Sequence, residues 1–145
     1  MASCIVYFTN VKIVVVCQSQ IENGPFIASR PVHSVERNGN NKILGDCVID
    51  ATKEQKIIRF DRDMIKKTMN EAQQATGFGS WKTLEKKTVA LFDVSISDEA
   101  VKISSYKRSE DGYGFEPLDE HFFCDVDSEI IGRELYEFEK TFKLT

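Results

Sequence analysis

The stretch from Cys4 to Cys17 (CIVYFTNVKIVVVC) constrains the fold more than any other part of the sequence. It is dense in Val, Ile, Tyr and Phe, which suit a pleated, half-buried surface. Fourteen residues are long for one strand, so we expect a bend or bulge at Thr9-Asn10. The chain therefore begins with a buried strand or a pair of strands.

Other parts of the chain also predict sheet. The clearest hairpin lies between Val89 and Lys107, where apolar and polar residues alternate on both sides of the turn Ser97-Asp98-Glu99. Shorter strands are expected over residues 26–36, 56–60 and 122–126. Pro31 indicates an edge position or a bulge in the first of these.

Helices are expected where apolar residues recur at helical spacing behind a capping residue. They cover residues 40–51, 61–76, 81–86 and 127–142. Strands do not alternate regularly with helices, and the best strand pair is a hairpin. We therefore predict an α+β fold, a single domain over residues 1–145 with a mostly antiparallel β-sheet packed against three or four helices.

The cysteines and the N-terminus indicate an intracellular protein. The apolar start has no basic stretch before it and no small-residue cleavage pattern, and Lys12 interrupts it. The four cysteines, at positions 4, 17, 47 and 124, show no paired spacing. We expect a cytoplasmic location, four reduced thiols and no bound metal.

Few residues are available for catalysis. The chain has two histidines, His33 in strand-like sequence and His121 after Asp119 and Glu120, whose carboxylates could orient an imidazole. A small hydrolase using His121 with Asp119 or Glu120 is one alternative, and a pocket joining both histidines would favour it. No metal-ligand or phosphate-binding spacing is present, so we expect no enzyme activity and no cofactor.

Acidic residues are concentrated in the last quarter of the chain. Residues 1–60 and 61–108 each carry a net charge of +2, whereas residues 109–145 carry −8. Part of this charge suits a helix N-terminus or a solvated helix face. The surplus lies in an expected loop from Glu110 to Glu120, where aromatic residues stand among carboxylates. An ordinary solvated loop is one interpretation, and a surface that attracts a basic protein and repels nucleic acid is the other. The candidate contact residues are Glu110, Asp111, Tyr113, Phe115, Glu116, Asp119, Glu120 and Asp125.

Several short motifs relate this chain to one known family. They are the run from Gly77 to Leu84 (GFGSWKTL), a Phe/Val strand followed by Val101-Lys102-Ile103-Ser104, the segment Gly112-Tyr113-Gly114-Phe115, and the acidic-start, Gly-containing stretch from Asp127 to Leu135. Ile43-Leu44-Gly45 fits an earlier helix. Together these motifs resemble the immunity proteins of bacterial contact-dependent growth inhibition systems.

The resemblance implies a cytoplasmic inhibitor that binds and neutralises the C-terminal toxin domain delivered by a neighbouring cell. The toxin in such systems is commonly a nuclease, and the inhibitor blocks it without chemistry of its own. A nuclease is basic, so an acidic inhibitor suits it. The partner predicted in this way is a cognate toxin domain, with no direct contact to nucleic acid or membrane. An adaptor protein unrelated to any toxin is the remaining alternative.

Overall fold

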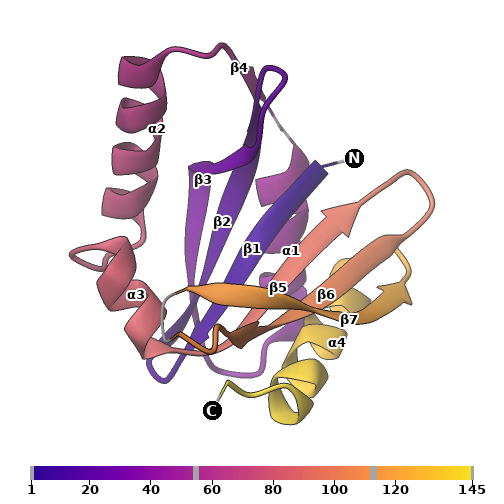
Figure 1. The fold of residues 1–145 in the computed structure, drawn as a ribbon. Coiled ribbons are helices and arrows are strands. Elements are labelled where there is room, and N and C mark those ends of the chain that lie inside the picture. The colour runs from indigo at the N-terminus through magenta and orange to yellow at the C-terminus, as the bar shows by residue number, and fades with distance from the viewer. Residues whose placement is uncertain (1, 54–55, 112–113, 145) are drawn as a thin grey trace.

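The computed structural model describes residues 2–53, 56–111 and 114–144. Within these residues the chain forms the following strands and helices, in this order: β1 (Ala2–Thr9), β2 (Lys12–Ile21), β3 (Phe26–Glu36), α1 (Asn41–Lys53), β4 (Ile57–Ile58), α2 (Arg62–Ala75), α3 (Trp81–Lys87), β5 (Thr88–Ile96), β6 (Val101–Arg108), β7 (Phe115–Cys124) and α4 (Ser128–Thr141). Figure 1 shows their arrangement.

The strands form one sheet in the order β3-β2-β1-β5-β6-β7, with antiparallel pairing throughout, and the short β4 adds to the end of β2 in parallel. The run from Cys4 to Cys17 is a hairpin that turns after Thr9, and its two strands pair from Ser3 opposite Gln18 to Phe8 opposite Ile13. The predicted α+β fold, with a mostly antiparallel sheet and four helices, is confirmed.

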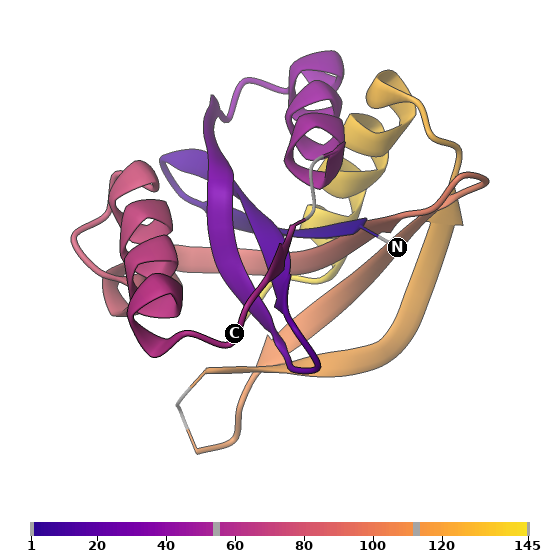
Figure 2. The same ribbon diagram turned by 90° about the horizontal axis from the view of Figure 1, so that it is seen from above.

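The helices cover the two faces of the sheet unequally. α1 and α4 lie side by side over one face, as Figure 2 shows, and the main core lies beneath them. Phe8, Phe92, Leu44 and Ile131 are fully buried there. On the other face a small cluster around Leu84 of α3 covers one end, while α2 packs along β3. Much of this second face is therefore available to a partner.

Helix starts follow the predicted capping residues. The side chains of Asp61, Ser80 and Asp127 each accept hydrogen bonds from backbone N–H groups in the first turn of the helix that follows. Such bonds satisfy donors that have no partner within the helix, and each stabilises its helix by about 1 kcal/mol.

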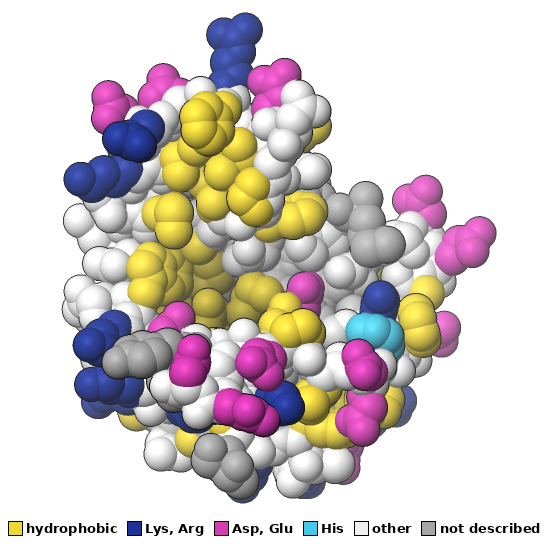
Figure 3. Space-filling model, viewed as in Figure 1, with side chains coloured by type: hydrophobic (Ala, Val, Ile, Leu, Met, Phe, Trp, Pro, Cys, Tyr) yellow, Lys and Arg dark blue, Asp and Glu magenta, His cyan; other side chains and the backbone are white. Residues whose placement is uncertain are grey.

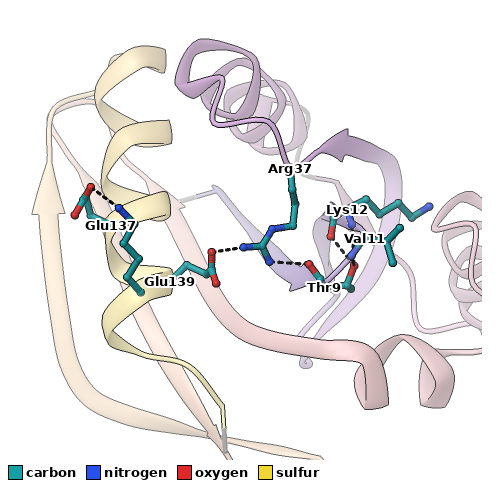
Figure 4. A network of polar contacts seen from close by, with 7 residues as sticks. Thr9, Val11, Lys12, Arg37, Glu137 and Glu139 are labelled. Carbon is teal, nitrogen blue, oxygen red and sulfur yellow. Dashed lines mark hydrogen bonds and ion pairs between the residues drawn. The ribbon is translucent and has the colours of Figure 1, made fainter.

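A partly buried ion pair ties the last helix to the start of the sheet (Figure 4). Arg37, between β3 and α1, donates to Glu139 of α4 at 2.5 Å and to the carbonyl oxygen of Thr9 at 2.7 Å. The Glu139 side chain is only 6% exposed, and the guanidinium lies 5.6 Å from the centre of the Phe8 ring. One side chain thus links β1, the core and α4.

The predicted acidic loop from Glu110 to Glu120 is largely strand, which corrects the sequence-based expectation. β7 begins at Phe115, not at residue 122, and ends at Cys124. The alternation that would reveal it is weak because β7 is an edge strand with little burial, and the pairing register shifts between Ser104 and Tyr106 of β6. Pro117 fits an edge strand, since no ladder bond needs its missing N–H.

Candidate protein-binding surface

The predicted acidic contacts lie along β7 and beside it. Figure 3 shows the molecule from the same side as Figure 1, and acidic side chains gather over the lower half of the view, where β7 crosses in Figure 1. Glu110 and Asp111 lie in the β6–β7 connection, and Asp125 follows the strand. The exposed carboxylates of this surface are Glu110, Asp111, Glu116, Asp119, Glu120 and Asp125. Tyr113 lies outside the described residues. We refer to these six carboxylates as the β7 acidic surface.

The contacts of two of these predicted residues are known. Lys107 Nζ lies 3.9 Å from Glu116 Oε2, and both side chains are about half exposed. An exposed pair of this kind adds little stability, so Glu116 stays available to a partner. Phe115 is half-buried, and the Arg108 guanidinium lies 5.4 Å from its ring centre. Arg108 also donates to the carbonyl oxygen of Thr88 at 2.8 Å. One side of Phe115 therefore already packs on its own chain.

The sequence analysis missed a recess that extends across the sheet as far as β6, the neighbour of β7. It measures about 350 Å³ and lies on the open face of the sheet, where Ser3, Gln18, Ser95 and Tyr106 surround Asp93. Ile5 and Phe26 complete the lining. The Tyr106 hydroxyl donates to Asp93 Oδ2 at 3.5 Å, whereas Asp93 Oδ1 has no hydrogen-bond partner among the described residues. Burial raises the pKa of Asp93, and the bond from Tyr106 opposes that rise. Burial also raises the pKa of Tyr106 to about 12.

The recess is suited to bind a hydrogen-bond donor. A carboxyl oxygen held away from water without a partner is costly, and a donor from another molecule removes that cost. An ammonium or guanidinium group gives the strongest bond to a carboxylate. The only sequence signal was a charged residue between Phe92 and Val94, at an outward position of an alternating strand. Asp93 is half-buried because β1 and β6 flank β5, and the sequence alone did not predict these two strands as its neighbours.

The two histidines lie on the opposite edge strands of the sheet. His33 of β3 has Nε2 2.7 Å from Asp50 Oδ2 of α1, while His121 of β7 has Nδ1 2.9 Å from Ser104 Oγ. Opposite edges of the sheet do not bring the two imidazoles together, so the described residues do not show the arrangement that would favour a hydrolase. Among the described residues no carboxylate bonds to His121, and no three His, Cys, Asp or Glu side chains cluster as metal ligands would.

Comparison with known proteins identifies the fold. No family model matches the sequence, and no curated protein matches it. A protein of unknown function from Neisseria meningitidis has a TM-score of 0.71 and 15% identity, over 93% of this chain and 91% of that one. A chain of the CdiA-CT/CdiI toxin and immunity complex from Yersinia pseudotuberculosis has a TM-score of 0.70 and 16% identity, over 93% of each chain. No helix in the described ranges is long and apolar enough to cross a membrane. At these identities the likeness shows that the chain shares the fold of both proteins.

Proposed function

We propose that this protein is an immunity protein of a contact-dependent growth inhibition system, which binds and neutralises a toxin domain in the bacterial cytoplasm. The observation that carries the proposal is the fold shared along almost the whole chain with part of a toxin and immunity complex. That neighbour supports a protein as the partner. The resemblance of the sequence motifs to the same class of proteins supports the same conclusion independently of the structure.

The proposed partner is a basic toxin domain, and a nuclease fits this description. A nuclease holds phosphates with Lys and Arg side chains, which an acidic surface attracts. The segment from residue 109 to 145 carries a net charge of −8, and its β7 acidic surface is exposed. Neutralisation then requires only that the inhibitor occupies the substrate-binding surface. No catalytic group of the inhibitor takes part.

The Asp93 recess extends the proposed contact beyond β7. β5, β6 and β7 are neighbours in the sheet, so the recess and the acidic strand belong to one region. A Lys or Arg side chain of the toxin that entered the recess would give Asp93 Oδ1 a partner. The proposed interface therefore combines exposed carboxylates, which attract the toxin, with one half-buried carboxyl group that fixes its position.

A charge-reversal experiment tests the surface. Glu116, Asp119 and Glu120 changed together to Lys should slow association with the toxin domain encoded next to this gene and flatten its salt dependence. Reversal of Glu22, Glu71 and Asp98, which are exposed elsewhere, gives the same change in net charge and serves as the control. Equal effects of the two triple variants would show that only net charge matters and that the β7 acidic surface is not the contact.

A growth-rescue experiment tests the function itself. Cells that express the toxin domain should grow only when this protein is present, and purified protein should capture the toxin in a pull-down. If neither occurs with the neighbouring toxin, the adaptor alternative replaces the immunity function.

Phe115→Ala adds a further test. If Phe115 is an anchor of the contact, its loss should weaken binding by about 1–3 kcal/mol. A lower melting temperature at unchanged affinity would assign Phe115 to packing on Arg108 alone.

A further inference from the structure

α2 presents an apolar face that its own chain covers only in part. Ala72 is the buried residue of this helix, and Ile65 and Met69 on the same face are half-buried. The C-terminal end is anchored to the sheet, because Lys12 Nζ of β2 donates to the carbonyl oxygen of Thr76 at 2.9 Å. The remaining length of the helix borders a hollow.

This hollow, of about 510 Å³, is lined by the apolar side chains of Ile21, Phe60, Ile65, Met69 and Trp81. We call it the α2 groove. Its volume lies in the range of ordinary ligand sites. Figure 3 shows hydrophobic side chains running from the region of β4 and α2 into a hollow at the centre of the face. The groove is therefore accessible from solvent.

Large apolar side chains remain exposed next to the groove. Phe60 is 81% exposed, Ile57 74% and Met64 50%. Single exposed hydrophobic residues are common, but Phe60 forms a patch with the four other apolar side chains that line the groove, and Ile57 and Met64 lie within four residues of it in the chain. Patches of this kind mark surfaces that another molecule covers.

The charge around the groove indicates the chemistry of that molecule. Arg62 and Lys66 line the groove, and Lys56, Arg59 and Lys67 are exposed in the same segment. Residues 56–67 carry a net charge of +3. Within the described part of the chain, none of the five cations forms an ion pair. Asp61, one of the two carboxylates of this segment, is engaged in capping α2, and Glu22 lies beside the segment, where its backbone N–H donates to the carbonyl oxygen of Ile58. The rim is thus basic.

We propose that the α2 groove binds an amphipathic helix of a protein partner, with apolar side chains in the hollow and carboxylates facing Arg62 and Lys66. A helix that lays its apolar face into a groove places anchors at positions i, i+3, i+4 and i+7. Acidic groups on that helix complement the rim. The β7 acidic surface is proposed to bind a basic partner, whereas the α2 groove is proposed to bind an acidic helix. The proposal for the groove therefore does not depend on whether the chain binds a toxin.

Two synthetic peptides probe the site on the full chain. One carries Leu and Phe at positions i, i+3, i+4 and i+7 with Glu elsewhere, and the other carries Lys in place of every Glu. Fluorescence anisotropy should show saturable binding of the acidic peptide and at least about tenfold weaker binding of the basic one, equivalent to about 1.4 kcal/mol. Equal binding of the two peptides, or no binding of the acidic one, would refute the proposal.

Matched variants locate the binding. Phe60→Ser should weaken the acidic peptide at least about tenfold without unfolding the protein, because Phe60 is largely exposed. Phe123→Ser, which alters a side chain 69% exposed on β7, should leave binding unchanged. Arg62→Glu with Lys66→Glu should remove the preference for the acidic peptide, while Lys42→Glu with Lys140→Glu should preserve it.

Two other outcomes contradict the proposal. Unchanged affinity of Phe60→Ser would show that the groove is not the binding site. Self-association of the wild type that Phe60→Ser abolishes, measured by analytical ultracentrifugation, would identify a second copy of this chain as the occupant.

Discussion

The contact between α1 and α4 depends on two glycines, and each faces the first residue of the other helix. A Cβ atom at Gly45 of α1 would overlap the backbone of Ser128, and one at Gly132 of α4 would overlap the backbone of Asn41. Both neighbours are backbone atoms, which cannot rotate away as a side chain does. We expect Gly45→Ala and Gly132→Ala to force the two helices apart.

The magnitude follows from two opposing effects. Alanine within a helix gains roughly 0.5–1 kcal/mol over glycine through its lower conformational entropy when unfolded. Ordinary contact needs about 3.5 Å between heavy atoms, so the helices must separate by on the order of 2 Å. Leu44 and Ile131, both fully buried, would then lose close packing. Overpacking costs typically about 1–3 kcal/mol and occasionally more. Because the overlap is with backbone atoms, we expect a cost at the upper end of this range, so each variant should lose about 2 kcal/mol net.

Urea unfolding followed by both circular dichroism and Trp81 fluorescence measures this loss, and coincident transitions would support a two-state analysis. Gly79→Ala is the matched control, because a Cβ there meets nothing within 4 Å. It should be neutral or stabilising by up to about 1 kcal/mol. The double variant Gly45→Ala/Gly132→Ala should lose less than the sum, since one separation relieves both overlaps. Wild-type stability in either single variant would refute this account of the helix contact.

Three further measurements follow from the structure. Glu139→Gln should lower the free energy of unfolding by about 1–3 kcal/mol because Arg37, itself partly exposed, loses its buried partner, whereas Glu137→Gln on the outer face of α4 should change it by less than about 0.5 kcal/mol. The Ser128 hydroxyl, and then Lys42, bind the carboxylate of Asp46 and lower its pKa. Stability linked to that pKa is present above the unfolded value of about 3.9 and is lost as the pH falls through the lowered folded value, so the difference between wild type and Ser128→Ala should vanish on acidification. Thiol titration without reductant should count four thiols in denaturant, and the two buried in the core should react much more slowly in the native protein.

Sequence patterns predicted those parts of the fold whose burial is set by local periodicity. Phe92 and Val94 alternate with polar residues because one face of β5 meets the core, and that period of two is visible in the sequence. α4 is equally readable, since Asp127 caps a helix whose buried residues include Ile131 and Leu135. β7 was predicted too short because an edge strand places few residues in the core, so its sequence carries little alternation.

Features that depend on distant segments could not be predicted in this way. The Asp93 recess exists because β1 and β6 flank β5, and no local pattern specifies that order. Gly45 and Gly132 belong to the sequence motifs, but glycine is required at these positions because α1 and α4, which are far apart in the chain, contact each other there. The acidic composition after residue 109 was evident, whereas its position beside the recess follows from the β5–β6 and β6–β7 pairings.

The two proposed sites carry opposite charges, and together these charges should orient a partner as it approaches. The β7 acidic surface and the basic rim of the α2 groove belong to different elements of the fold, so the net charge of −4 understates the local fields. A basic partner is attracted to β7 and repelled from Arg62 and Lys66, and it therefore approaches in a restricted orientation. Because screening acts over roughly 8 Å at physiological ionic strength, this selection operates only near contact. Reversing the charges of the rim should then alter the association of a basic partner even though that partner does not occupy the groove.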